Sequence, residues 1–352
     1  MQGHDSTEVL TPADARLGFW SPQPVDRSRT EARLDRFPAA VATTLVGQIG
    51  ALANIRSSSG CALVLCTDAP WLEVRLDRLR HHQGVPQAIA LETECVDGTI
   101  LTSVSEDLRE RDGEVTIRLA TGCERGGGMQ RVWCWLPTIS TVAIAGVALP
   151  AGARCQVPEL PEPRWLALGD SLTQGFCVAS PTQTWVHRCA RAWRMPTWNL
   201  GIGGLQIETD VFAWALAQRA WPLVTIALGS NHAWRDQDVA SVAARTRSLA
   251  DHVCAGAHGH IAWLLPPWKP CEDGKGPSDF AGIPLDQAAG QRMQNVRAFM
   301  REVLAEYASR IQLIDDLGAR DHRLYPDGLH PLALGSAQYA TQIQAALGGR
   351  IS

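Results

Sequence analysis

The sequence predicts two folded regions: an N-terminal β-sandwich or jelly roll over residues 1–155, and an α/β domain with a doubly wound parallel sheet over residues 156–352. In the first region, apolar side chains recur at every second position in short runs that turn residues interrupt, which is typical of antiparallel strands. In the second region, short apolar runs alternate with longer segments of helical period. Strands that alternate with helices favour a parallel sheet.

Composition allows two domains and disfavours several partners. With 352 residues, 45% of them hydrophobic, the chain is long enough for two cores. A net charge of -4 and the lack of a Lys/Arg block provide no broad attraction to nucleic acid or to an anionic membrane, so we expect neither partner. The first residues lack the basic start and apolar run of a signal peptide, and no apolar stretch is long enough to span a bilayer. We therefore expect a cytoplasmic protein.

The cysteines do not suggest a disulfide framework or a metal site. Ten cysteines are scattered singly, without a Cys-x-x-Cys pair, so we expect free and mostly buried thiols. His258 and His260 form a His-x-His pair that can in principle bind a metal, but the glycines around them indicate a loop before a strand. We expect no metal and no other cofactor.

The N-terminal region contains six short segments of alternating polarity, which we expect to form strands. These segments are 62–66, 71–76, 88–91, 115–119, 132–136 and 142–147. Four prolines then fall between residues 150 and 163. Proline cannot donate to a strand ladder and does not continue a helix, so this segment is expected to be a linker on the surface.

The C-terminal region contains five short apolar runs and five longer segments of helical period. The expected strands are 165–168, 197–200, 223–228, 261–265 and 311–314, and the expected helices are 184–193, 207–218, 239–255, 285–308 and 332–347. Doubly wound sheets bind their ligands beyond the carboxyl ends of the strands. Residues that follow these strands are therefore the candidates for a functional site.

A serine stands at the end of the first of these strands. Gly169-Asp170-Ser171-Leu172 directly follows the apolar run 165–168, so Ser171 lies where a strand gives way to a helix. Such a turn exposes a nucleophile at the edge of the sheet. The first N–H groups of the following helix are unpaired there and can stabilise a developing oxyanion. Asp170 is expected to cap or brace this turn.

Three further blocks follow in order: Asn199 to Gly204, Gly229-Ser230-Asn231, and Asp327-Gly328-Leu329-His330. A serine hydroxyl is a weak nucleophile until a base removes its proton, and His330 is the candidate base. Asp327, three positions earlier, can accept a hydrogen bond from the imidazole and select its tautomer. Taken singly, Asp327 is more typical of a turn residue and His330 of a helix entry, and only their combination with Ser171 indicates a triad.

The four blocks resemble the SGNH (GDSL-type) hydrolases, and the match covers roughly residues 160 to 350. This family of esterases, lipases, deacetylases and some acyltransferases is built on a flavodoxin-like sheet. The resemblance implies a catalytic triad of Ser171, Asp327 and His330. It also implies an oxyanion hole formed by the backbone N–H groups of Ser171 and Gly204 and the side-chain amide of Asn231.

One position departs from the family. Members commonly carry Asp directly after the oxyanion Asn, whereas this chain has His232, so the hydrogen bonds that hold the oxyanion loop must differ. A structural or substrate-lining His232 is favoured over a second base. The Pro- and Gly-rich loop 266–284 is expected to lie over the site, and its Trp268, together with Trp234, can line the substrate.

The resemblance implies a serine esterase that hydrolyses a short acyl or acetyl ester of a small molecule or sugar through an acyl-serine intermediate. The two-domain arrangement is similar both to acetylxylan-type esterases and to GDSL-like acyltransferases, so transfer of the acyl group to an alcohol is the alternative. A third alternative is a non-catalytic carbohydrate-binding protein. It is disfavoured because the catalytic and oxyanion positions are all retained.

Overall fold

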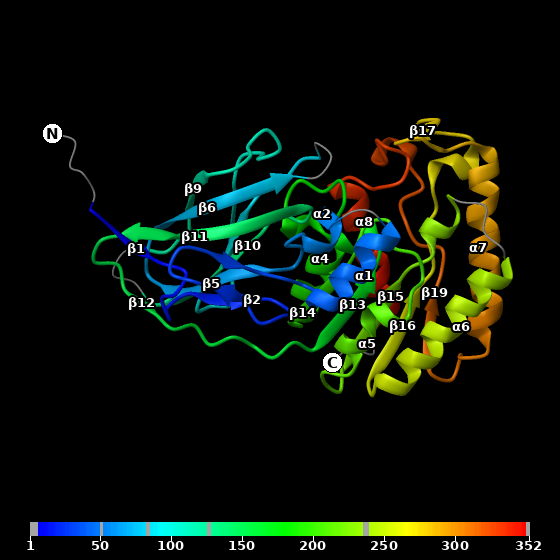
Figure 1. Cartoon of the computed structure of the whole chain (residues 1–352), viewed down its shortest axis with the longest axis horizontal. Coiled ribbons are helices and arrows are strands. Elements are labelled where there is room, and N and C mark those ends of the chain that lie inside the picture. Colours follow the sequence, from blue (N-terminus) through cyan, green and yellow to red (C-terminus); the bar gives the residue numbers. More distant parts are fainter. Residues whose placement is uncertain (1–5, 50–51, 82–84, 125–127, 235–238, 350–352) are drawn as a thin grey trace. The chain divides into compact units, whose positions relative to one another are not determined.

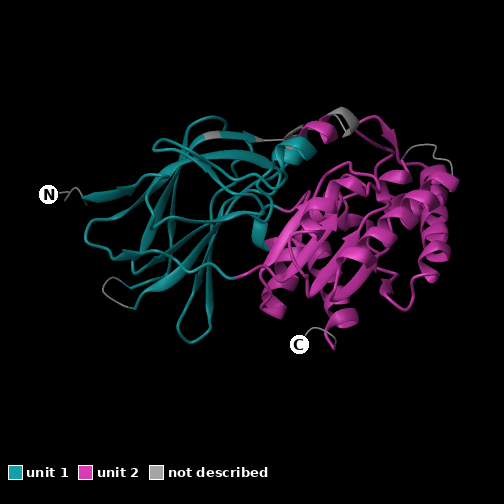
Figure 2. Ribbon diagram, turned by 60° about the horizontal axis from the view of Figure 1, so that its bottom comes forward, with its two compact units in different colours: residues 1–42, 52–161, 179–182 teal, residues 43–51, 162–178, 183–352 magenta. Residues whose placement is uncertain are grey.

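The computed structural model describes residues 6–49, 52–81, 85–124, 128–234 and 239–349. The chain divides into two compact units (Figure 2). The first comprises residues 1–42, 52–161 and 179–182, and the second comprises residues 43–51, 162–178 and 183–352. The division between domains at residues 155 and 156 stays a prediction.

Unit 1 contains two antiparallel sheets of six strands each (Figure 1). One sheet has the order β3 (Asp26–Arg27), β4 (Ala32–Arg33), β11 (Ser140–Pro150), β6 (Trp71–His81) and β9 (Val115–Ala120), and β1 (Thr7–Leu10) also pairs with β11. The other has the order β12 (Cys155–Gln156), β5 (Ala62–Thr67), β10 (Gln130–Trp135), β7 (Ala90–Glu94) and β8 (Ile100–Val104), and β2 (Gly18–Trp20) also pairs with β5.

The two sheets share one hydrophobic core, which makes unit 1 a β-sandwich. Leu63 and Leu65 of β5 belong to the same buried cluster as Leu72 and Val74 of β6. β5 and β6 therefore each send alternate side chains to this shared core, as the period of two predicts. On β10, Trp133 and Trp135 stack with ring centroids 5.2 Å apart.

Every strand predicted in unit 1 is present, but several short elements were not predicted. They are β1 to β4, β8 and β12, together with α2 (Leu52–Arg56). The helix α1 (Ala39–Ile49), which was not predicted either, begins in unit 1 and continues into unit 2. The expected linker also needs correction. β11 runs up to Pro150, and Cys155 and Gln156 then pair with β5, so pairing resumes inside the proline-rich segment. The prolines themselves lie outside this two-residue strand.

Unit 2 is built on a parallel sheet of five strands in the order β14 (Thr197–Gly201), β13 (Trp165–Gly169), β15 (Leu223–Ala227), β16 (His260–Leu264) and β19 (Ile311–Ile314). Numbered within the unit, this order is 2-1-3-4-5, the arrangement of flavodoxin-like sheets. The predicted fold class is therefore confirmed, and the order places β13 between β14 and β15.

Helices cover both faces of this sheet (Figure 1). On one face α4 (Trp185–Trp193) packs against α8 (Ala333–Leu347), and Trp165 of β13 lies in their common core. On the other, α6 (Val239–Gly256) packs against both α5 (Asp210–Leu216) and α7 (Gln287–Ala305). Among the described residues, no helix is long and apolar enough to cross a membrane.

The loop expected over the site contains regular structure. Residues 266–284 include the 3-10 turn η3 (Pro270–Asp273) and a short hairpin of β17 (Asp279–Phe280) and β18 (Ile283–Pro284). The first part of the segment is buried: Trp268 is 6% exposed and Lys269 is 1% exposed. The loop is therefore partly a component of the core of unit 2.

Two glycines let the short helix α3 (Ser171–Gln174) lie directly on the strand ends. A Cβ atom on Gly201 of β14 would overlap the backbone of Thr173 and Gln174. A Cβ atom on Gly169 of β13 would overlap the side chain of Thr173. Because neither glycine carries a side chain, α3 starts immediately beyond the sheet.

We predict that Gly201→Ala lowers the free energy of unfolding by about 1–3 kcal/mol, because the added methyl group forces α3 away from β14. Denaturant unfolding of the purified variant measures this loss. Gly128→Ala is the matched control, since a Cβ atom there meets nothing within 4 Å. Equal stability of the two variants would contradict the close packing.

Candidate active site

Ser171 is the first residue of α3 and follows β13, whose five residues are all buried. Asp170 caps the helix: its backbone is extended, and its side chain accepts a hydrogen bond of 3.0 Å from the Leu172 N–H. Gly175 ends the helix in the left-handed conformation, at φ 100°. The serine is thus held on a tight turn at the carboxyl edge of the sheet, and it is 9% exposed.

A chain of hydrogen bonds links the serine to a histidine and an aspartate. Ser171 Oγ lies 2.8 Å from His330 Nε2, and His330 Nδ1 lies 2.6 Å from Asp327 Oδ2. If Nδ1–H donates to the carboxylate, Nε2 remains an acceptor for the serine hydroxyl. The structure therefore brings together the three residues that the sequence proposed as a triad.

Asp327 is held as a carboxylate by several donors. Its Oδ1 accepts hydrogen bonds from the backbone N–H groups of Leu329, at 2.9 Å, and of His330, at 2.8 Å. Burial by itself would raise the pKa of Asp327. The hydrogen bond and charge of the His330 ring, together with these two N–H groups, outweigh burial and hold the pKa well below its usual range.

Two aromatic rings contact the imidazole. The Phe176 ring lies 4.6 Å from the His330 ring between centroids, and the Phe280 ring of β17 lies 5.5 Å away at an interplanar angle of 68°. Phe280 and Trp234 also pack against the cluster of Cys271, Leu285, Ala289 and Leu329. The loop 266–284 thus supplies one apolar side chain next to His330, as its predicted position over the site requires.

Cys177 is a neighbour that the sequence analysis did not predict. Its thiol donates to Asp327 Oδ2 over 3.4 Å, and its backbone takes a φ of 63°, which is uncommon for a residue with a side chain. Burial and the adjacent Asp327 carboxylate raise the pKa of this thiol, so it remains protonated as a donor. No sequence signal marks it, because a single cysteine after a helix has no pattern.

The other proposed oxyanion donors follow the two strands that flank β13. Gly204 follows β14 with φ 81°, is exposed, and a Cβ atom there would meet nothing within 4 Å, so its backbone faces open space. Asn231 lies in η2 (Ser230–His232) beyond β15, and its Nδ2 donates to the Leu205 carbonyl over 2.9 Å. This bond uses one of the two amide protons and orients the other.

Polar side chains fix the loop that carries Gly204. Asn199 Nδ2 donates to the Thr173 carbonyl over 2.7 Å, and Asn199 Oδ1 accepts from the Gly201 N–H at 2.9 Å. Gln174 Oε1 accepts from the Gly203 N–H at 2.6 Å. The loop after β14 is therefore tied to the helix that begins with Ser171, so both elements are positioned together.

His232 stands where an aspartate is common, and its ring makes a hydrogen bond between the two loops that carry the proposed oxyanion donors. Its Nε2 accepts a hydrogen bond of 3.1 Å from the Ile207 N–H, which ties the turn after β15 to the loop after β14. The side chain is 1% exposed, so a substrate-lining role finds no support in this placement. Trp268 is likewise buried at 6%, next to Tyr325, whereas Trp234 is half-buried.

One group of side chains in the described part of the chain has the proximity of a metal site. The ligand atoms of Cys177, Asp327 and His330 all lie within 4.8 Å of one another. Hydrogen bonds from the thiol and the imidazole to the Asp327 carboxylate account for this proximity. The expectation that no metal is needed stays a prediction.

Comparison with known proteins places this arrangement in a family. Residues 167–338 match the model of the GDSL-like Lipase/Acylhydrolase family. No curated protein matches the chain.

Several solved structures share the fold over nearly the whole length of both chains. The salicylyl-acyltransferase SsfX3 from a tetracycline biosynthetic pathway is 23% identical over 97% of each chain, with a TM-score of 0.72. A structure named as a GDSL-like lipase, from Bacteroides ovatus, is 15% identical over 98% of each chain, with a TM-score of 0.79. The acetyl xylan esterase Est2A from Butyrivibrio proteoclasticus is 10% identical over 98% of each chain, with a TM-score of 0.59.

At these identities the solved structures show a common fold, and the match to the family model carries the assignment. It agrees with the resemblance found in the four sequence blocks. The segment that forms the parallel sheet and its serine, asparagine and histidine loops is a GDSL-like lipase/acylhydrolase domain.

Proposed function

We propose that the chain is a serine esterase that hydrolyses a carboxylic ester through an acyl-serine intermediate, with Ser171, Asp327 and His330 as its catalytic triad. The observation that carries this proposal is the unbroken hydrogen-bond chain from Asp327 Oδ2 through the His330 ring to Ser171 Oγ. General-base catalysis requires a direct contact between the serine hydroxyl and its base, and His330 Nε2 lies within that distance of Ser171 Oγ.

The proposed reaction has two halves. In the first, His330 Nε2 takes the proton of Ser171 Oγ as this oxygen attacks the ester carbonyl, and the imidazolium then protonates the departing alcohol. In the second, His330 takes a proton from water, the resulting hydroxide attacks the acyl-serine, and the acid is released as Ser171 recovers its proton. Asp327 stabilises the imidazolium in both halves, for which its lowered pKa suits it.

The N–H groups of Ser171 and Gly204 and the Asn231 amide are proposed to stabilise the oxyanion. Gly204 supports this role because its backbone faces open space, and no acceptor for its N–H is found in the described part of the chain. Asn231 supports it because its amide is already held by Leu205. Donors fixed in advance need no reorganisation when the charge develops.

Acyl transfer is the second candidate, since the acyl-serine is common to both reactions and the structurally similar SsfX3 is named an acyltransferase. The two reactions differ only in the molecule that takes the acyl group from Ser171, which is water in hydrolysis and an alcohol in transfer. We propose a small-molecule ester or an acylated sugar as substrate. Location in the cytoplasm and the absence of nucleic-acid and membrane partners stay predictions from the sequence.

The test is a panel of short and long p-nitrophenyl esters and acetylated sugars, incubated with and without an alcohol acceptor. Release of the free acid in water supports the esterase. Formation of a new ester, with faster release of nitrophenol when the alcohol is added, supports the transferase. If an organophosphorus ester fails to label Ser171 in the folded protein, a non-catalytic binding protein becomes the better account.

We predict that Ser171→Ala and His330→Ala each lower kcat by a factor on the order of 10⁴ or more, because each removes one member of a single proton-transfer unit. The double variant should be hardly slower than either single variant. Steady-state kinetics of the folded variants measure this, with the exposed Ser278→Ala and His322→Ala as controls. Losses that multiply would show that the two residues do not share a step.

We predict that Asn231→Ala lowers kcat by about a hundredfold and leaves KM nearly unchanged, because its amide is proposed to bind the oxyanion of the transition state. The exposed Asn295→Ala is the control. Circular dichroism should confirm that the loop change leaves the fold intact. An effect confined to KM would remove Asn231 from the oxyanion hole.

A further inference from the structure

Lys269 is an unusual residue in this chain. The sequence contains 30 arginines but only two lysines, Lys269 and Lys275, and both lie in the loop 266–284. Lys275 is exposed, whereas Lys269 is 1% exposed. Removing an ammonium group from water is costly unless other groups compensate its charge. The burial of Lys269 therefore requires nearby groups that compensate its charge.

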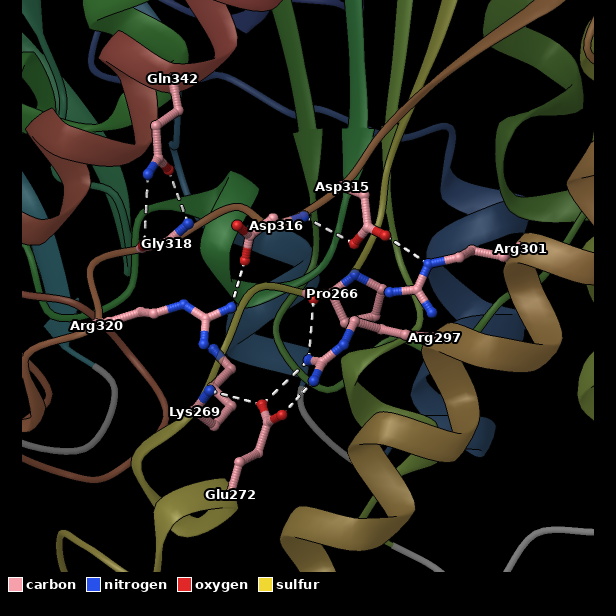
Figure 3. A network of polar contacts seen from close by, with 10 residues as sticks. All are labelled: Pro266, Lys269, Glu272, Arg297, Arg301, Asp315, Asp316, Gly318, Arg320 and Gln342. Atoms are coloured by element: carbon pink, nitrogen blue, oxygen red, sulfur yellow. Dashed lines mark hydrogen bonds and ion pairs between the residues drawn. The ribbon is translucent and has the colours of Figure 1, made fainter.

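The backbone N–H of Lys269 is held by Glu272, whose carboxylate Arg297 binds in turn (Figure 3). Its N–H donates to Glu272 Oε1 over 2.8 Å, and Arg297 of α7 binds the same carboxylate, with its Nη1 at 3.0 Å. Arg297 Nη1 also lies 3.3 Å from the Pro266 carbonyl oxygen. The side chains of Arg297 and Glu272 are only 12% and 4% exposed. The segment from Pro266 to Glu272 is thus anchored on α7, which determines where the Lys269 side chain enters the interior.

The ammonium of Lys269 reaches the loop that carries the proposed base. Nζ donates to the carbonyl of Leu329, the residue before His330, and lies 5.7 Å from the centroid of the Tyr325 ring. The N–H groups of Leu329 and His330 donate to Asp327 Oδ1. The short backbone segment next to the imidazole is therefore held by Asp327 through its N–H groups and by Lys269 through a carbonyl.

The charge of Lys269 also acts on buried carboxylates. Burial raises the pKa of Asp170, the cap of α3, while the Leu172 N–H and the charges of Lys269 and His330 oppose this shift. Burial lowers the pKa of Lys269 to about 8, while Asp170, Asp327 and Glu272 oppose that shift. The titratable groups that face the ammonium are these three carboxylates, Cys271 and Tyr325.

We propose that Lys269 is a positioning residue of the esterase site: its ammonium holds the Leu329 peptide and so aligns His330 with Ser171. This inference rests on the proposed function. Lysine suits the position because its flexible stem carries a compact ammonium to a single acceptor, the Leu329 carbonyl.

The test compares Lys269→Met with Lys275→Met, the matched control on the same loop. Lys269→Met should lower kcat about tenfold to a hundredfold with KM within about twofold, because a small displacement of His330 affects the chemical step more than binding. Lys275→Met should behave as the wild type. Wild-type kcat and KM in Lys269→Met, with the fold intact, would overturn the proposal.

The pH profile separates positioning from a merely structural role. In the wild type, kcat should fall as the pH rises through about 8, because the neutral amine of Lys269 donates a weaker hydrogen bond to the Leu329 carbonyl than the ammonium does. Lys269→Met should lack this alkaline limb. An unchanged profile in the variant would contradict the inference.

Two outcomes remain: a Lys269→Met variant that does not fold, and a wild-type protein without esterase activity. If Lys269→Met does not fold, wild-type protein with ¹⁵Nζ-labelled lysine gives two signals, and Lys275→Met assigns one of them. Titration of the Lys269 signal together with the alkaline limb of activity supports the proposal, and titration without any change in activity overturns it. If wild-type protein neither hydrolyses p-nitrophenyl acetate nor reacts with an organophosphorus ester at Ser171, it is the proposed function that fails.

Discussion

The hydrogen bond between His330 Nε2 and Ser171 Oγ joins residues 159 positions apart in the sequence. Ser171 follows β13, in the interior of the sheet order, and His330 comes after the edge strand β19 and before α8. A proton moves between these atoms only when they lie within hydrogen-bond distance. The whole sheet, with its five parallel strands, therefore sets the one distance on which the proposed chemistry depends.

Two carboxylates near His330 have pKa values displaced in opposite directions. Asp170 is 1% exposed and its pKa is raised by burial, whereas the pKa of Asp327 is lowered. The difference arises because Asp327 accepts from the His330 ring and from two backbone N–H groups, which outweigh its burial. Neighbouring carboxylates can thus take separate roles, one as the ionised partner of the imidazole and the other as the buried cap of α3.

The fold does not decide between hydrolysis and acyl transfer. Solved structures named as an acyltransferase and as an esterase share the architecture over nearly all of this chain. A fold positions the nucleophile and base, while the choice of second acceptor depends on how the site admits water or an alcohol. Phe176 and Phe280 place apolar rings against His330, and Phe280 belongs to the hairpin of β17 and β18.

Local patterns in the sequence were sufficient for the five parallel strands and the five longer helices of unit 2, for the place of Ser171, and for the combination of Asp327 with His330. These features depend on periodicity and on residues adjacent in the chain. Short strands such as β3 and β12, which span two residues each, carry no period and were missed. Only the tertiary structure brought Cys177 to Asp327, His232 to Ile207, and Lys269 to the Leu329 carbonyl. Each of these contacts joins segments distant in sequence, and its strength comes from burial and from the geometry of the partner, which no local pattern encodes.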